Sequence, residues 1–260
     1  MKWITENYHT HTERCGHAHG SDRAFVEAAI EAGIRVLGFS DHTPMPFRDP
    51  TFRSGAHIPL EKAQDYFDSL TRLREEYKDR ITIRIGVEAE YYPETFDTYL
   101  DYITQFPVEY LILGQHYIGR EEDGDFSMRA SDDEIRLAAF FQNLTDAVHS
   151  GKFLYIAHPD VINFTGSDAI FRKYAEPFLE EVKRADMALG INRFGILDHR
   201  NYPNKVFWRL VGEVGCKALI ELDAHTPDVF ADEATEAACL AFAESCGVEL
   251  VRHLDIPELL

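Results

Sequence analysis

The amino-acid sequence predicts an α/β fold: a single-domain, distorted (β/α)7 barrel with a metal site at the carboxyl ends of its strands. Seven short apolar runs alternate with seven helical patterns along the 260 residues, an order typical of a parallel sheet covered by helices. Polar side chains follow each apolar run directly. Because the carboxyl ends of barrel strands meet at one mouth, these side chains are expected to form a single site.

The seven apolar runs are rich in aliphatic and aromatic side chains, and their short lengths predict buried strands rather than helices. They lie at Trp3–Tyr8, Val36–Phe39, Ile81–Ala89, Tyr110–Gly114, Phe153–Ala157, Ala188–Asn192 and Ala218–Leu222.

Between these runs, apolar residues recur at the spacing of amphipathic helices, and several segments carry start or stop signals. Ser131 is followed three residues later by Glu134, which predicts a capping box, and Gly33, Gly151 and Gly247 fall where helices are expected to end. The predicted helices are Ser21–Ala32, Leu60–Lys78, Pro93–Gln105, Ser131–Ser150, Asp168–Asp186, Pro203–Val214 and Asp232–Cys246.

Composition predicts one large domain over residues 1–260, because 45% of the residues are hydrophobic and can build a substantial core. The sequence shows neither an apolar run of membrane-spanning length nor an export leader, so we expect a cytoplasmic protein without membrane association. The four cysteines include no close pair and no zinc-knuckle spacing, which favours reduced thiols.

The first metal-binding signal is the pair His9 and His11, which is followed by His17. Two histidines separated by one residue point to the same face of a strand, where two protonated rings would repel each other. Neutral imidazole is a common ligand of transition metals, so a bound ion explains the pair.

The remaining strands end in further candidate ligands, which we expect to meet at the mouth of the barrel. After the second to seventh strands come, in order, Asp41 and His42; Glu88 and Glu90; Gln115 and His116; His158 and Asp160; Asn192 and Arg193; and Asp223 and His225.

The order of these residues resembles the PHP (polymerase and histidinol phosphatase) family of metal-dependent phosphoesterases, over nearly the whole chain from Tyr8 to about Thr226. Within that family, the segments Phe39–Pro46, Arg84–Tyr91 and Asn192–Gly195 are similar to those of stand-alone histidinol-phosphate phosphatases. The resemblance implies a distorted seven-stranded β/α barrel, which agrees with the independent strand count.

The resemblance also implies a set of ligands for two to three divalent transition metals. One ion would be held by His9, His11, Glu88 and Asp223, a second by His17, His42 and His225, and a third by His116 and His158. Glu88 would bridge the first and third ions, because a carboxylate supplies two oxygens. The mixture of imidazole and carboxylate suits Zn, Mn or Fe and argues against Ca or an iron–sulfur cluster.

The activity implied by the resemblance is hydrolysis of a phosphomonoester, with L-histidinol phosphate as the expected substrate and a metal-bridging hydroxide as the nucleophile. Glu88, Asp223 and His225 are the expected catalytic residues, and Asp223 or His225 is the expected proton donor to the leaving alkoxide. Asn192 is expected to contact the phosphate or the rest of the substrate, together with either Arg193 or Arg200.

Two aspartates and four further histidines are expected to have other roles. Asp41 and Asp160 are expected to support ligand imidazoles through hydrogen bonds, because the second nitrogen of a metal-binding ring usually donates to a carboxylate or carbonyl. Ordinary surface or core roles are expected for the remaining histidines, which are His57, His149, His199 and His253.

The formal charge of −19 argues against nucleic-acid binding, which depends on basic surfaces, so a small phosphorylated substrate is the expected partner. Three divalent cations would reverse the local sign at the mouth and admit a phosphate there. Two alternatives stay open: a PHP phosphoesterase acting on another small ester, a nucleotide or a nucleic-acid end, and a non-catalytic PHP binding module. Amidohydrolases commonly use a strand-four lysine, and none lies in Leu111–His116. The oligomeric state stays open.

Overall fold

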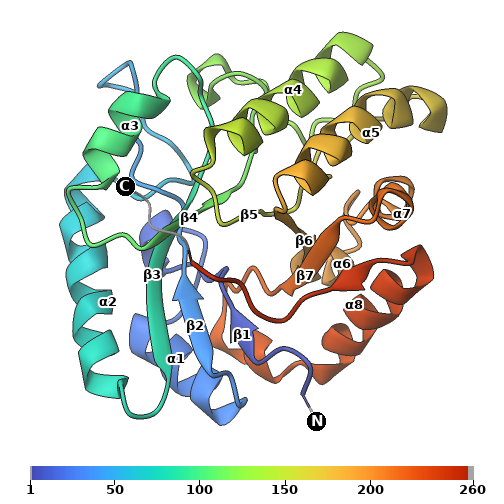
Figure 1. Cartoon of the computed structure of the whole chain (residues 1–260). Coiled ribbons are helices and arrows are strands. Elements are labelled where there is room, and N and C mark those ends of the chain that lie inside the picture. Colours follow the sequence, from blue (N-terminus) through green and yellow to red (C-terminus); the bar gives the residue numbers. More distant parts are fainter. Residues whose placement is uncertain (1, 257–260) are drawn as a thin grey trace.

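A sheet of eight parallel strands in sequential order forms the centre of the protein, and helices surround it (Figure 1). The computed structural model describes residues 2–256. The strands are β1 Glu6–Asn7, β2 Val36–Phe39, β3 Thr82–Ala89, β4 Tyr110–Leu113, β5 Tyr155–Ile156, β6 Ala188–Asn192, β7 Lys217–Glu221 and β8 Glu249–Leu250. The seven predicted strands are confirmed, although β1 and β5 are shorter than predicted. The two-residue strand β8 was not predicted.

The seven predicted helices are also present, each within a few residues of its expected bounds. The α-helices are α1 Asp22–Glu31, α2 Ala63–Tyr77, α3 Phe96–Ile103, α4 Glu134–Ser150, α5 Asp168–Arg184, α6 Arg193–Leu197, α7 Lys205–Val214 and α8 Glu233–Cys246. The 3-10 helices are η1 Glu13–Cys15, η2 Leu60–Lys62, η3 Glu121–Asp123 and η4 Pro227–Ala231. Helix α6, which directly follows β6, was not predicted.

The predicted start of α4 was wrong by a few residues. Asp133, not Ser131, caps the helix, because its side chain accepts hydrogen bonds from the backbone amides of Ile135 and Arg136. The predicted stops are correct: Gly151 and Gly247 end α4 and α8, and Gly33 follows the last cap residue of α1, all with left-handed backbone, where glycine avoids the steric cost of a Cβ.

The sheet curls until its first strand reaches its seventh. Thr10, beyond the end of β1, forms a parallel bridge with Ala224, beyond the end of β7. The backbone amide of His11 donates to Ala224 O at 3.0 Å, and the amide of Ala224 donates to His9 O at 3.1 Å. This seam lies at the carboxyl end of the strands and gives the distorted (β/α)7 barrel that the sequence predicted. Among residues 2–256, strand β8 pairs with β7 alone.

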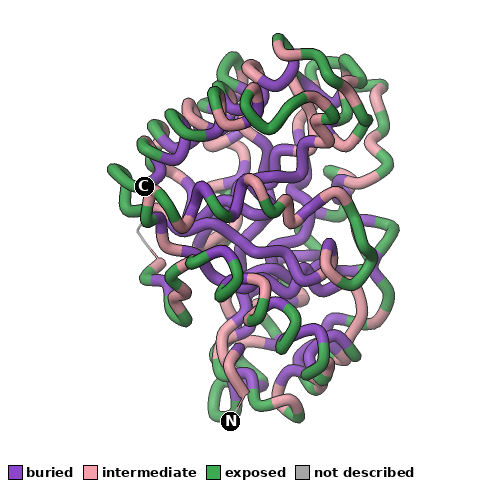
Figure 2. Tube along the Cα trace, turned by 90° about the vertical axis from the view of Figure 1, so that its right-hand side faces the viewer, coloured by how far each residue is buried: buried purple, intermediate pink, exposed green. Residues whose placement is uncertain are grey.

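The core lies between the strands and the surrounding helices. In Figure 2 the buried segments, drawn in purple, lie in the interior of the molecule. A representative contact joins α4, α5 and α7, where Phe178 lies 5.5 Å from Phe141 and 6.5 Å from Phe207 between ring centroids. Within residues 2–256, no helix is long and apolar enough to cross a membrane.

Inside the barrel, Tyr110 lies beneath the carboxyl ends of the strands. Its hydroxyl is 2.9 Å from Tyr8 O and 3.1 Å from Phe39 O, so it lies against the ends of the first two strands. A Cβ at Gly86 would come within 2.5 Å of the Tyr110 ring, so glycine leaves the space that this ring occupies. The cavity described next lies at the carboxyl ends of the strands.

Candidate metal centre

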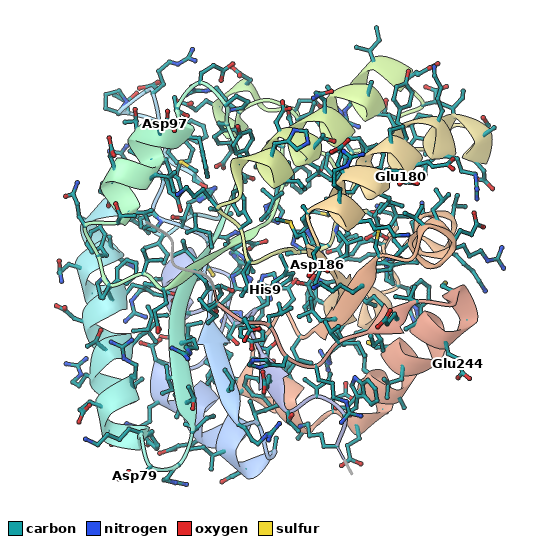
Figure 3. All side chains as sticks on the ribbon, in the orientation of Figure 1. His9, Asp79, Asp97, Glu180, Asp186 and Glu244 are labelled. Atoms are coloured by element: carbon teal, nitrogen blue, oxygen red, sulfur yellow. The ribbon has the colours of Figure 1, made fainter. Side chains whose placement is uncertain are left out.

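The structure brings together all nine side chains that the sequence predicted as metal ligands. They are His9, His11, His17, His42, Glu88, His116, His158, Asp223 and His225, and all of them except His9 line a cavity of about 500 Å³. His9 is fully buried and lies near the centre of the ring of strands in Figure 3, where the exposed acidic residues Asp79, Asp97, Glu180 and Glu244 mark the outer surface.

Glu88 occupies the middle of the cluster, and its two carboxylate oxygens face different histidines. Oε1 lies 3.0 Å from His158 Nε2 and 3.6 Å from His116 Nε2. Oε2 lies 3.0 Å from His42 Nδ1 and 3.5 Å from His9 Nε2. Burial alone would raise the pKa of Glu88, but the surrounding imidazoles lower it well below the ordinary value of a glutamate. Glu88 therefore lies where a carboxylate that bridges two metal ions would have to lie.

The absence of a side chain at Gly114 makes room for this carboxylate. A Cβ at this position would lie 1.9 Å from Glu88 Oε1 and 2.5 Å from Glu88 Cδ, far inside any normal contact. Glycine at the end of β4 is therefore a condition for the observed position of Glu88.

The hydrogen bonds of His9 and His11 leave two nitrogen lone pairs facing each other. His9 Nδ1 is 3.0 Å from Glu221 Oε2, and His11 Nδ1 is 3.1 Å from Asp41 Oδ1. Because a carboxylate only accepts, each Nδ1 carries the proton, and in the neutral rings each Nε2 presents a lone pair. These two Nε2 atoms are only 3.0 Å apart, and Asp223 Oδ1 lies 3.0 Å from His11 Nε2. A cation among them would replace this repulsion with attraction.

Two carboxylate oxygens in the cluster, Glu88 Oε2 and Asp223 Oδ1, are buried and lack hydrogen-bond partners within the described part of the chain. Each faces an imidazole nitrogen, His42 Nδ1 and His11 Nε2 respectively. Leaving buried carboxylate oxygens unsatisfied costs stability, and a bound cation would satisfy them. The residues present therefore fit divalent metal ions.

A second group of imidazoles lies at the more open side of the cavity. The rings of His17, His42 and His225 surround His11, and His225 stacks on it with 4.2 Å between the centroids. Burial and the neighbouring His11 lower the pKa of His225 to about 4. Burial alone would also lower the pKa of His9, but the carboxylates of Asp223, Glu88 and Glu221 raise it to about 10, so an ion bound at His9 would displace a proton.

Glu221 is a central residue that the sequence analysis did not assign. Besides His9, it accepts from the Tyr155 hydroxyl at 3.0 Å, the backbone amide of His158 at 2.9 Å and Asn192 Nδ2 at 3.0 Å. It lies two residues before Asp223, so strand alternation already places both side chains on one face. That spacing was the available signal.

Of the two aspartates expected to accept hydrogen bonds from ligand imidazoles, Asp41 does so and Asp160 does not. Asp41 accepts from His11 Nδ1 and, at 3.0 Å, from the backbone amide of Thr12. Asp160 instead accepts from Trp208 Nε1 at 3.0 Å and from the backbone amide of Asn204, so it holds the start of α7. Burial raises the pKa of Asp160 to about 7.

The two candidate phosphate-binding arginines lie in different environments. Arg200 lines the cavity, where its guanidinium lies 4.3 Å from the centroid of the Phe194 ring and donates to the Tyr202 hydroxyl at 3.0 Å. Arg193 is 2% exposed, does not line the cavity and forms an ion pair with Asp232 at the start of α8.

The third candidate substrate contact, Asn192, is 1% exposed and does not line the cavity. Its Nδ2 donates to Asp223 Oδ2 at 3.0 Å, and its Oδ1 accepts from the amide of Gly195 at the start of α6. In the structure, Asn192 therefore holds Asp223 and the α6 turn.

His57 is buried beside this centre, although the sequence analysis expected an ordinary role for it. It lines the same cavity, and its ring centroid lies 5.8 Å from that of His42. Burial alone would lower the pKa of His57, but the nearby carboxylates of Glu90 and Glu121 raise it to about 9. Its position 15 residues after His42, within a long loop, gave no spacing signal.

Comparison with known proteins finds a matching protein family and similar proteins from other organisms. The PHP domain family matches residues 7–194. A protein of Deinococcus radiodurans named probable histidinol-phosphatase is 30% identical over 226 residues, which cover 84% of this chain and 85% of that protein. A protein of Schizosaccharomyces pombe with the same name is 25% identical over 245 residues, covering 84% of this chain and 80% of that protein.

Two solved structures share the fold. The histidinol phosphate phosphatase of Lactococcus lactis, described as a complex with zinc, L-histidinol and phosphate, matches with a TM-score of 0.73 at 19% identity, covering 97% of this chain and 99% of that one. A putative histidinol phosphatase of Listeria monocytogenes has a TM-score of 0.73 at 18% identity, covering 89% of this chain and 99% of that one. At these identities the likeness shows the common fold.

Proposed function

The chain belongs to the PHP domain family, and from that premise we propose that it is a metal-dependent phosphomonoesterase whose substrate is L-histidinol phosphate. The observation that carries the proposal is the position of Glu88, whose two oxygens face two groups of imidazoles at the base of a cavity of about 500 Å³. A cavity of this volume suits a small ester rather than a polymer.

We propose that the nine residues predicted from the sequence hold two to three divalent ions, which are Zn, Mn or Fe. Their carboxylates and neutral imidazoles are competent ligands for these metals. When bound, such ions supply Lewis acidity and lower the pKa of water toward neutrality.

The phosphoryl group would be held by Arg200. Its guanidinium is fixed between the Phe194 ring and the Tyr202 hydroxyl at the cavity wall, so little conformational freedom is lost when it binds two phosphoryl oxygens. Arg200 also pairs with Asp198, whose side chain is exposed, but it faces the cavity. Arg193 is less suitable because its guanidinium is buried away from the cavity, where it pairs with Asp232.

The reaction requires one proton to move from the attacking water to the departing ester oxygen. Asp223 Oδ1 faces the cluster without a hydrogen-bond partner among the described residues, and Asn192 fixes the other oxygen of the same carboxylate. We propose that Asp223, through a lone pair that metal binding leaves free, accepts the proton as water attacks phosphorus and returns it to the alkoxide. His225, which also lines the cavity, is the alternative carrier.

The choice of substrate rests on the relatives and on the cavity wall. The relative from Deinococcus radiodurans is named for histidinol phosphate hydrolysis, and the Lactococcus lactis structure is described with L-histidinol and phosphate. In this chain Tyr117, Phe126 and Tyr202 line the cavity and offer ring surfaces to an imidazole. Glu90 lines it too and gives the wall a carboxylate.

The test is a comparison of kcat/KM across phosphate esters with the metal-loaded protein. We expect a higher value for histidinol phosphate than for p-nitrophenyl phosphate, although p-nitrophenolate is the better leaving group, because contacts to the imidazole and amine lower the barrier. Nucleotides, sugar phosphates and 5′-phosphorylated oligonucleotides are the competing substrates. Turnover of one of them orders of magnitude faster would reject histidinol phosphate, and metal binding without turnover of any ester would indicate a binding module.

A further inference from the structure

Beside the nine predicted ligands lies a second cluster of ligand-type side chains, formed by His57, Glu90 and Glu121. All three are buried. His57 comes from the loop between β2 and α2, Glu90 directly follows β3, and Glu121 begins η3 in the segment after β4. We propose that these residues form an additional binding site for a single divalent transition-metal ion.

The His57 ring is oriented as a ligand to such an ion would be. Its Nδ1 lies 2.7 Å from the carbonyl oxygen of Thr43, so this nitrogen carries a proton, and a metal ion bound at Nε2 would displace the proton that the two carboxylates favour there in its absence. Nε2 lies 3.3 Å from Glu121 Oε2 and 3.6 Å from Glu90 Oε2. Both separations are longer than the usual N–H···O hydrogen bond.

These separations match those between ligands of a common ion. Two ligand atoms about 2.1 Å from a tetrahedral metal ion are separated by roughly 3.4 Å. Pairs in the main cluster show the same spacing: His9 Nε2 is 3.5 Å from Glu88 Oε2, and His116 Nε2 is 3.6 Å from Glu88 Oε1. The second cluster therefore repeats the spacing found among the predicted ligands.

An unpartnered oxygen provides an independent indication. Glu121 is 6% exposed, and its Oε1 accepts from the Ser54 hydroxyl at 2.8 Å. Its Oε2, the atom that faces His57, has no hydrogen-bond partner within residues 2–256. A buried carboxylate oxygen without a donor is costly, whereas an ion at this point would satisfy it.

The charges of the cluster also favour a cation. Within residues 2–256, the only ion pairs of Glu90 and Glu121 are with the imidazoles of His57 and His116. The nearest arginine in sequence, Arg120, is paired with Glu122 instead. Even with His57 protonated, the three residues together carry one excess negative charge, which among the described residues only the His116 ring faces, whereas a divalent ion would neutralise both carboxylates.

The donor set defines the class of metal. One imidazole and two carboxylates suit Zn, Mn or Fe(II), and a three-ligand site leaves room for water. Glu90 Oε2 also accepts from the Tyr92 hydroxyl, and Glu90 Oε1 lies 3.3 Å from His116 Nδ1. The additional site shares no ligand with the nine predicted residues but touches one of them through Glu90.

The test is anomalous diffraction from crystals of the full-length wild-type protein soaked in MnCl2 or ZnCl2. We expect one peak bounded by His57 Nε2, Glu90 Oε2 and Glu121 Oε2, separate from the peaks at the main cluster. In elemental analysis, Glu121→Gln should bind about one equivalent less metal than the wild type. The matched control, Glu122→Gln, removes a neighbouring carboxylate outside the cluster and should keep the full content.

Two results would overturn the proposal. One is a main cluster filled with metal beside an empty position at His57. The other is nitrogen-15 spectra of the metal-loaded wild-type protein in which both nitrogens of His57 carry protons, because that ring would then be an imidazolium paired with the carboxylates. If Glu121→Gln does not fold, His57→Gln replaces it in the elemental analysis. Occupancy of the main cluster is read from its own peaks, so failure here is distinguishable from failure of the proposed enzyme.

Discussion

Replacing Gly114 by alanine should displace the central carboxylate of the metal centre. The added Cβ would lie 1.9 Å from Glu88 Oε1, 2.5 Å from its Cδ and 2.6 Å from its Cγ. Real Cβ atoms almost never approach another heavy atom closer than 3.0 Å, so either the carboxylate or strand β4 must move by about 1 Å. Overpacking of this kind typically costs about 1–3 kcal/mol of stability.

The functional cost should be larger than the cost in stability. A misplacement of about 1 Å at a catalytic centre can lower the rate on the order of 100-fold, and Glu88 faces His9 and His158, which belong to the two predicted ion positions that it would bridge. We therefore expect Gly114→Ala to lose kcat/KM by about that factor and to bind less metal. The assays are phosphate release from a phosphomonoester and elemental analysis, with circular dichroism to verify folding.

Gly55 supplies the matched control. A Cβ at this position meets no atom within 4 Å, so Gly55→Ala should leave kcat/KM and metal content unchanged. A folded Gly114→Ala protein with wild-type kcat/KM and metal content would refute the reasoning, because the position of Glu88 would then not depend on the space beside Gly114.

Three further predictions concern the metal, the phosphate and the nucleophile. Glu88→Ala should lose more than one equivalent of metal in elemental analysis; loss of a single equivalent would contradict its role as a bridge. Arg200→Ala should lower kcat/KM by an amount equivalent to losing about 2–4 kcal/mol of transition-state stabilisation. Arg193→Ala should mainly lower the melting temperature, because the ion pair with Asp232 is lost. The reverse pattern would assign phosphate binding to Arg193. Hydrolysis in oxygen-18 water should place one labelled oxygen in phosphate with inversion at phosphorus, and a trapped phosphoryl-enzyme would contradict direct attack by water.

The fold and the position of the cluster were predictable because both follow from short-range patterns. Apolar runs mark the strands, and polar residues directly after them mark one mouth of a parallel barrel. Strand β8 was missed because two residues carry no periodicity; it pairs with the amino-terminal part of β7.

Other features depend on three-dimensional contacts that the sequence does not encode locally. Arg193 and Arg200 both follow β6, and the unpredicted helix α6 separates their environments. Arg193 begins α6 and pairs with Asp232 at α8, whereas Arg200 follows α6 and lies in the cavity wall. His57 lies in a long loop, so its approach to Glu90 and Glu121 could not be inferred from spacing.

The seam between β1 and β7 determines when the metal centre can exist during folding. The metal centre draws on residues from both ends of the barrel sequence. His9, which follows β1, and Glu221, which ends β7, hydrogen-bond to each other although they are 212 residues apart. Contacts at such separations form late, because closing a long loop loses entropy before any contact compensates for it. A growing chain that has not yet made β7 lacks Asp223 and His225, and so cannot complete the coordination. Metal uptake therefore belongs to the end of folding and marks the molecules in which the barrel has closed.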